Sequence, residues 1–152
     1  MATSAIPILL CGRRESVGAT AIEMLKPEYE VVHFITSPED GRTNIPLILS
    51  GRGPSSQQSD LGTKDFSQVP RAIVFGGGYD DTVIDELRNT VMGTPGLKKV
   101  PWVKADQQKT AAGPQPRTKA YVEAIAPRIK EALRLLEANG SLGGSEDGIF
   151  SW

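Results

Sequence analysis

The sequence predicts an α/β domain built on a small parallel sheet of about four strands and closed by a long C-terminal helix. Three observations predict it. Apolar segments typical of buried parallel strands alternate with amphipathic segments of helical period. Glycine-rich turns follow two of these strands, as in folds where a strand passes directly into a helix. The 152 residues suffice for one ordinary domain with a substantial core.

The first part of the chain predicts a strand, a helix and a second strand. Residues 6–11 are almost all apolar, as expected for a strand that is covered on both faces. Residues 17–25 have helical spacing, and Lys26-Pro27 ends that helix. Residues 29–35 are β-branched and aromatic in character and predict the second strand.

The segment from residue 36 to residue 70 is the least regular. Residues 44–50 fit one or two helical turns or a strand fragment. Residues 51–60 are rich in Gly, Ser and Gln and predict a mobile loop, although a loop of this length can also be functional.

The second half continues the alternation. Its predicted elements are a strand over 71–75, a helix over 80–92 with Gly93 at its end, a strand over 100–104 and a long helix over 118–139. Pro101 indicates an edge position for the fourth strand, because proline cannot donate a ladder hydrogen bond. Pro127 should kink the long helix.

Right-handed crossovers make this sheet parallel and predict the strand order 2-1-3-4. Such a sheet is doubly wound, as in Rossmann-like and flavodoxin-like folds, and its order reverses between the first and third strands. Ligands bind in that crevice, beyond the carboxyl ends of the strands. We expect residues 1–139 to form a single domain and residues 140–152 to form a tail.

Two glycine-rich turns should meet at the crevice. Gly12 makes a tight turn, Gly18 lets the helix pack close to the sheet, and the small Ser16 leaves the backbone approachable. The start of a helix also attracts an anion. The alternative is that the two glycines simply bracket a loop. The predicted cofactor-binding residues are Gly12, Arg13, Arg14, Ser16, Val17, Gly18, Thr36, Ser37, Gly76, Gly77 and Gly78.

The glycine spacing resembles the G-x-x-x-G-x-G turn of short-chain dehydrogenase/reductase-like Rossmann proteins, with Ser16 at the middle glycine. No acidic residue that would hold a ribose 2′-hydroxyl appears after the second strand until Glu39. Arg13, Arg14 and Arg42 offer cations to a 2′-phosphate instead, so NADP(H) is the expected cofactor. Solvated surface charge is the alternative role of the first two arginines.

The sequence assigns no catalytic residue. No tyrosine has a lysine four residues later, as such reductases require. The candidates are Asp80, Asp81 and His33. One of the aspartates is expected to cap the following helix, and a histidine within a strand is more often structural than a general base. Cys11 is expected to be a buried hydrophobe, and no metal site is expected.

A wider resemblance rests on several segments. They are residues 6–18 and 25–34, Asn44-Ile45-Pro46-Leu47, the Gly-Gly-Gly-Tyr-Asp-Asp loop at 76–81 and Val100-Pro101-Trp102. Together they resemble short Rossmann-like proteins of filamentous fungi over most of the chain. The resemblance implies an NAD(P)-binding-like fold and carries no assigned reaction.

Three functions therefore stay open. The first is binding of NADP(H) or another phosphorylated nucleotide, as an oxidoreductase component or as a sensor. The second is a small isomerase or lyase that acts on a metabolite through Asp80, Asp81 or His33. The third is a non-catalytic interaction module.

Charge and composition narrow the partners to a small-molecule ligand. The formal net charge of −1 argues against nucleic acid and anionic membranes, and no apolar run approaches the roughly 20 residues of a membrane span. With no secretory signal and one cysteine, a cytoplasmic location is expected. Residues 149–152 are too apolar for a solvated end and should dock on their own domain or on a second subunit of a homodimer. A frayed end is the alternative.

Overall fold

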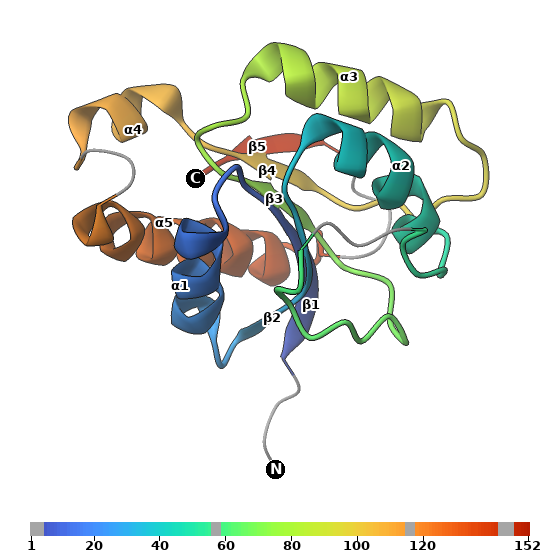
Figure 1. The fold of residues 1–152 in the computed structure, drawn as a ribbon, viewed down its shortest axis with the longest axis horizontal. Helices are drawn as coiled ribbons and strands as arrows, with labels where there is room; N and C mark the ends of the chain where they lie inside the picture. Colours follow the sequence, from blue (N-terminus) through green and yellow to red (C-terminus); the bar gives the residue numbers. More distant parts are fainter. Residues whose placement is uncertain (1–4, 56–58, 115–117, 143–147) are drawn as a thin grey trace.

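The fold is a parallel sheet with helices on both faces (Figure 1). The structure is a computed structural model and describes residues 5–55, 59–114, 118–142 and 148–152. Within these residues, five strands form one sheet in the order β2-β1-β3-β4-β5. They are β1 (Ile6–Cys11), β2 (Tyr29–Ile35), β3 (Ile73–Phe75), β4 (Trp102–Lys104) and β5 (Ile149–Ser151). The predicted α/β class and the order 2-1-3-4 are confirmed, and a fifth strand extends the sheet.

The helices form two layers. Helices α1 (Glu15–Leu25) and α5 (Lys119–Ala138) pack on one face, and α2 (Pro38–Leu49) and α3 (Asp81–Met92) pack on the other. The short helix α4 (Gln107–Ala112), which the sequence analysis did not predict, follows the carboxyl end of β4. The buried apolar side chains form two clusters, one on each face of the sheet. Leu10 belongs to the cluster on the α1/α5 side, and its neighbour Cys11 belongs to the cluster on the α2/α3 side.

Helix α2 begins earlier than the sequence analysis predicted. Ser37 caps it, since its hydroxyl accepts a hydrogen bond from the amide of Asp40 at 3.1 Å. Pro38 occupies the first turn, where its missing amide hydrogen has no cost. Of the two alternatives for residues 44–50, the helical one is confirmed, but one or two turns was too short, because the helix runs from Pro38 to Leu49 and contains Pro46.

The predicted edge position of the fourth strand was wrong. Strand β4 pairs with β3 on one side and β5 on the other. Pro101 lies just before β4 and serves the sheet through its carbonyl group, which accepts a hydrogen bond from the amide of Ile73 at 3.1 Å. A proline just before the strand can accept this hydrogen bond, and no ladder hydrogen bond there requires its missing amide hydrogen. It is therefore compatible with an interior strand.

The C-terminal residues dock on their own domain. Trp152, which follows β5, is 1% exposed, and its indole nitrogen donates a hydrogen bond to the carbonyl of Phe75 at 2.9 Å. The guanidinium carbon of Arg128 lies 4.6 Å from the centre of the indole ring. The tail thus belongs to the sheet and to the core on the α1/α5 side.

The predicted mobile loop and the predicted tail fall partly outside the described residues. Residues 56–58 of the loop at 51–60 and residues 143–147 of the tail are the parts that lie outside. In the described part of the loop, the amide of Ser55 donates to the side-chain oxygen of Asn44 at 2.8 Å, and Ser59 is buried.

The outer edge of β2 is covered by the loop that connects α2 to β3. The amides of Thr63 and Lys64 donate to the carbonyls of Val31 and Val32, each at 2.9 Å. Gly62 reaches the strand with a φ of +98°, where a Cβ atom would lie 2.8 Å from the carbonyl carbon of Val32. A glycine is therefore needed for this close approach, and the loop protects an edge that would otherwise be open to pairing.

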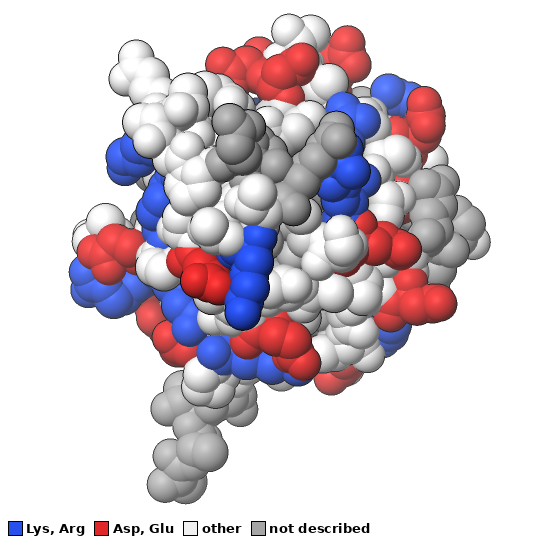
Figure 2. Space-filling view, turned by 60° about the vertical axis from the view of Figure 1, so that its left-hand side comes forward, with Lys and Arg blue, Asp and Glu red and all other residues white. Residues whose placement is uncertain are grey.

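Figure 2 shows basic and acidic side chains interspersed over one face of the molecule, in keeping with the formal net charge of −1. None of the helices in the described part of the chain is both long and apolar enough to cross a membrane.

Candidate functional site

A cavity of about 300 Å³ lies at the carboxyl ends of β1 and β3, on the face covered by α1 and α5. It occupies the predicted switch point of the sheet. Its walls are formed by the two glycine turns, by apolar side chains from both helices and from β2, and by three polar side chains. These residues are Leu10, Cys11, Gly12, Arg13, Arg14, Val17, Gly18, Ala21, Phe34, Gly76, Gly77, Gly78, Tyr121, Ile125 and Ile129.

The ring of Phe34 explains both glycines of the first turn. A Cβ atom at Gly12 would lie 2.9 Å from Cζ of Phe34, and one at Gly18 would lie 2.5 Å from its Cε1. Neither distance is possible for a real side chain unless the buried ring moves. The prediction that Gly18 permits close helix-to-sheet packing thus gains a specific partner, which projects from β2.

Arg13 connects the two glycine turns. Its Nε donates a hydrogen bond to the carbonyl of Gly78 at 3.2 Å, and a Cβ atom at Gly78 would meet the arginine side chain at 2.7 Å. The guanidinium also stacks on Tyr79, with 4.8 Å between its carbon and the ring centre. Because its side chain is held in this way, Arg13 fixes the mouth of the cavity rather than moving freely in solvent.

The structure brings together most of the predicted cofactor-binding residues, but not all of them. Gly12, Arg13, Arg14, Val17, Gly18, Gly76, Gly77 and Gly78 all line the cavity. Ser16 is exposed on α1 and does not line it. Thr36 and Ser37 lie at the start of α2, where Ser37 is the cap of that helix.

The candidate catalytic aspartates lie outside the cavity walls. Asp80 caps α3, because its carboxylate accepts a hydrogen bond from the amide of Val83 at 2.9 Å. Asp81 forms an ion pair with Lys104 at 2.9 Å. Cys11 packs its side chain into the apolar cluster on the opposite face, where burial raises the pKa of its thiol. It is therefore a protonated hydrophobe, as expected.

Tyr121 is a cavity residue that the sequence analysis missed. Its hydroxyl lies beside Gly77, since a Cβ atom there would be 2.9 Å from the phenol oxygen. Burial raises the pKa of Tyr121, while a hydrogen bond with the Gly77 backbone and the charge of Arg128 act in the opposite direction. The phenol is therefore neutral at ordinary pH and can donate a hydrogen bond into a mostly apolar space. No local pattern marks this tyrosine, because only the packing of α5 brings it to the glycine turn.

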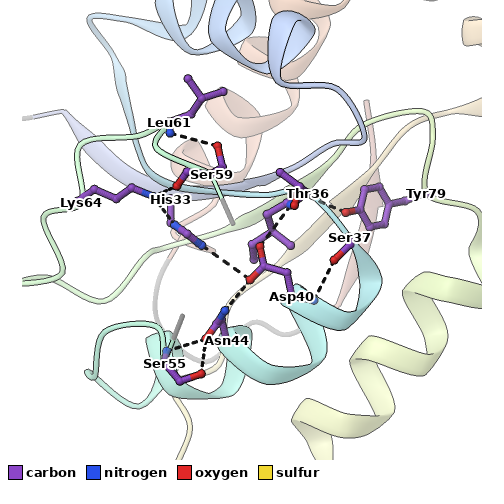
Figure 3. A network of polar contacts seen from close by, with 11 residues as sticks. His33, Thr36, Ser37, Asp40, Asn44, Ser55, Ser59, Leu61, Lys64 and Tyr79 are labelled. Carbon is purple, nitrogen blue, oxygen red and sulfur yellow. Dashed lines mark hydrogen bonds and ion pairs between the residues drawn. The ribbon is translucent and has the colours of Figure 1, made fainter. Parts of the chain in front are cut away.

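A second polar centre is built around His33, on the α2 side of β2 (Figure 3). His33 is 0% exposed. Its Nδ1 lies 2.8 Å from Nζ of Lys64, and its Nε2 lies 4.0 Å from a carboxylate oxygen of Asp40. A lysine ammonium has donors only, so Nδ1 accepts and the ring proton sits on Nε2, facing Asp40.

Asp40 is itself buried and enclosed by donors. The side-chain amide of Asn44 donates to it at 2.5 Å, and the backbone amide of Thr36 lies 3.4 Å away. Burial raises the pKa of Asp40, but the nearby His33 and the hydrogen bond from Asn44 outweigh burial and hold the pKa below its ordinary value. Asp40 is thus an ionised carboxylate. The sequence indicated His33 as a candidate, but it indicated neither Asp40 nor Lys64.

Comparison with known proteins identifies a relative. No protein-family model and no solved structure matches the chain. The sequence is 35% identical over 145 residues to the protein of Aspergillus oryzae named "Kojic acid related protein 6", and the match covers 93% of this chain and 84% of that protein. The expected likeness to a fungal protein is therefore confirmed at the level of sequence. The chain belongs to the fungal family of Kojic acid related protein 6.

Proposed function

We propose that the protein binds NADP(H) or another phosphorylated nucleotide at the cavity between the two glycine turns. The observation that supports this most directly is the convergence of both turns, two arginines and the start of α1 on one cavity at the switch point of the sheet. In open α/β sheets this is the place where ligands bind.

The phosphate would lie at the start of α1. Arg14 is the N-cap residue of this helix, and its side chain makes no capping hydrogen bond, so the first amides are left for a ligand. The Arg14 guanidinium is exposed at the rim and adds a positive charge. The negative charge of Glu15 in the first turn repels a bound phosphate and so lowers the affinity for it.

The preference for a 2′-phosphate rests on the end of β2. An acid is present near this point, since Asp40 lies close to the backbone amide of Thr36. Its carboxylate, however, is buried and engaged by Asn44 and His33, and so cannot hold a ribose hydroxyl. Without an available acid there, NADP(H) is favoured over NAD(H).

The cavity volume limits which part of a nucleotide enters. About 300 Å³ is at the lower end of the range for ligand sites and suits one ring system. The remainder of a dinucleotide would lie across the open rim. Inside the cavity, the Tyr121 hydroxyl is placed to donate to a polar atom of the ring.

A second candidate function is binding of a small ring metabolite without a dinucleotide. It is favoured by the size and apolar lining of the cavity, and the name of the Aspergillus oryzae relative makes kojic acid the natural probe. In this case Tyr121 would hold the ring, and Arg14 would contribute little.

Titration calorimetry of NADPH, NADP, NADH, NAD and kojic acid separates the two. If a nucleotide phosphate sits at α1, Arg14→Gln should weaken binding about tenfold or more, the effect of losing one charge-assisted hydrogen bond. Glu15→Gln should strengthen it, and Arg52→Gln, an exposed arginine outside the cavity, should leave it unchanged.

Tyr121→Phe should weaken whichever ligand enters the cavity. Binding of kojic acid alone, insensitive to Arg14→Gln, would favour the metabolite and contradict the nucleotide. If the wild-type protein binds none of the five compounds, the NADP(H) site and the kojic acid alternative are both wrong.

A further inference from the structure

Lys64 combines two features that are uncommon in a lysine. Its φ of 61° puts a non-glycine residue in the left-handed region, and among the described residues it is the one non-glycine residue with a positive φ. Its ammonium group is held by neutral acceptors, Nδ1 of His33 at 2.8 Å and the carbonyl of Ser59 at 2.7 Å. Backbone strain of this kind collects at functional sites, and it persists where the surroundings hold the residue in place.

The groups behind Lys64 form an ordered relay (Figure 3). Lys64 donates to one nitrogen of His33, and the other nitrogen faces the ionised Asp40, 4.0 Å away. Nε2 of His33 is buried and has no hydrogen-bond partner within the described structure, so Asp40 is the group available to it. An amine, an imidazole and a carboxylate in this sequence have the arrangement that activates a nucleophile.

We propose that Lys64 is a nucleophilic lysine that condenses with small carbonyl compounds, with His33 as the base that takes its proton and Asp40 as the residue that orients His33. The ligand class is an aldehyde or a ketone, which forms an imine with the amine. This reactive centre is spatially separate from the nucleotide site, since His33 pairs with Asp40 of α2 while the cavity lies on the face covered by α1 and α5.

The reaction needs no further reagent. The Lys64 ammonium transfers a proton to Nδ1 of His33, and the Asp40 carboxylate stabilises the imidazolium. The amine attacks the carbonyl carbon, a C–N bond forms, and the carbonyl electron pair moves to oxygen, which takes the proton from His33. His33 then relays one N–H proton of the attached amine to the hydroxyl, the nitrogen lone pair forms the C=N bond, the C–O bond breaks and water leaves. The products are one imine and one water molecule for each amine and carbonyl consumed.

The surroundings of Lys64 ease the loss of its proton. Burial lowers the pKa of Lys64, while the carboxylates of Asp60, Asp40 and Glu15 act against it. These three acids come from the loop, from α2 and from α1, and burial outweighs them. The side chain stays partly exposed, so a small carbonyl compound can reach it.

The test is reductive labelling of the whole protein. It is incubated near pH 7 with propionaldehyde and cyanoborohydride, which traps imines as stable alkyl-lysines, and modified peptides are quantified by mass spectrometry over time. Lys104 and Lys130 are internal controls, because their side chains are 27% and 28% exposed and each pairs with a carboxylate rather than with an imidazole. Lys64 should be modified several-fold faster than either control lysine, because its amine loses a proton to His33 more readily.

Variants identify the relay. His33→Gln should reduce the labelling rate of Lys64 to that of the two control lysines, while the rates at Lys104 and Lys130 stay unchanged. Asp40→Asn should have a smaller effect in the same direction. Unchanged control rates and an unchanged circular dichroism spectrum show that the variant is folded.

The wild-type comparison needs no variant and decides the proposal by itself. If Lys64 is labelled no faster than Lys104 and Lys130, the His33 centre only anchors the loop to β2, and the proposal is wrong. A folded His33→Gln protein with an unchanged Lys64 rate would likewise overturn the role of the histidine. Nucleotide binding is measured separately and does not enter either outcome.

Discussion

Replacing Gly18 with alanine tests the packing that shapes the cavity. In an unobstructed helix this change stabilises a protein by about 1 kcal/mol, because glycine is the weaker helix former. Here the new Cβ atom would lie 2.5 Å from Cε1 and 2.6 Å from Cζ of Phe34. Such overpacking in a core costs about 1–3 kcal/mol. We therefore expect Gly18→Ala to lower the free energy of unfolding, by up to about 2 kcal/mol when both terms are combined.

A double-mutant cycle with Phe34→Leu makes the prediction specific. Leucine has no ring at the position that the new Cβ atom would meet, so the steric cost should fall and the helix-forming gain should remain. Gly18→Ala should then stabilise the Phe34→Leu protein by up to about 1 kcal/mol, a reversal of sign. Urea denaturation of the four proteins, followed by circular dichroism, measures each free energy.

Gly41→Ala serves as the control. It also places alanine inside a helix, but the new Cβ atom would lie 3.3 Å from the flexible end of Leu87. A change close to zero or slightly stabilising is expected there. If Gly18→Ala has the same effect with and without the Phe34 ring, the ring is not what requires the glycine, and the reasoning fails.

Three further outcomes follow from contacts described above. Trp152→Ala should lower the free energy of unfolding by about 3–5 kcal/mol, because a buried indole and its hydrogen bond are lost, and a urea midpoint equal to wild type would contradict the docked tail. Asp40→Asn should destabilise the protein at pH 7. Because the pKa of Asp40 is lowered in the fold, its stabilisation is present above the unfolded pKa of about 4 and is lost as the pH falls through the lower folded pKa. The gap to wild type should therefore narrow in acid, and an equal gap at pH 7 and pH 3 would refute this. Asp80→Ala should cost about 1 kcal/mol through loss of the α3 cap and should leave ligand binding unchanged, whereas reduced affinity would return Asp80 to the site.

The central strands could be predicted because their signals are local. The apolar run at residues 6–11 and the β-branched and aromatic run at residues 29–35 are typical of buried strands. The rule that crossovers are right-handed then gives their order in the sheet. Strand β5 could not be predicted in the same way. Ile149–Ser151 has three residues and no periodicity, and it is a strand because β4 offers it a partner. The interior place of β4, and so the error over Pro101, follows from that pairing.

The candidate sites likewise combine features that are visible in the sequence with features that only packing creates. The glycine turns are visible in the sequence and lie together on the cavity, as the strand order requires. Tyr121 reaches them from a helix more distant in the chain, and no motif announces it. Likewise, His33, Asp40 and Lys64 come from a strand, a helix and a loop, so their chemistry exists only after packing. Sequence reasoning could name the histidine but could not assign it partners.

An irregularity in β2 places both sites. Strict alternation along the strand would put Val31 and His33 on one face and Phe34 on the other. The register shifts by one residue, because Ile8 pairs with Val31 and Leu9 pairs with His33. The extra residue, Val32, restores Phe34 to the same face as Val31, under the first glycine turn. The bulge therefore directs Phe34 to the cavity and His33 to Asp40.

Gly62 lies against this bulge, which gives a way to perturb both sites at once. A Cβ atom at Gly62 would meet backbone atoms of Val32 and His33 at 2.8 and 2.9 Å, and the φ of +98° is strained for alanine. Since backbone cannot yield as a flexible side chain can, Gly62→Ala should displace the loop or the bulge. The Lys64 labelling rate should fall and the stability of the protein should decrease. If the bulge itself moves, ligand binding at the cavity falls too, because the Phe34 ring moves with it. A folded Gly62→Ala protein with unchanged stability and unchanged Lys64 labelling would show that the bulge does not depend on this glycine.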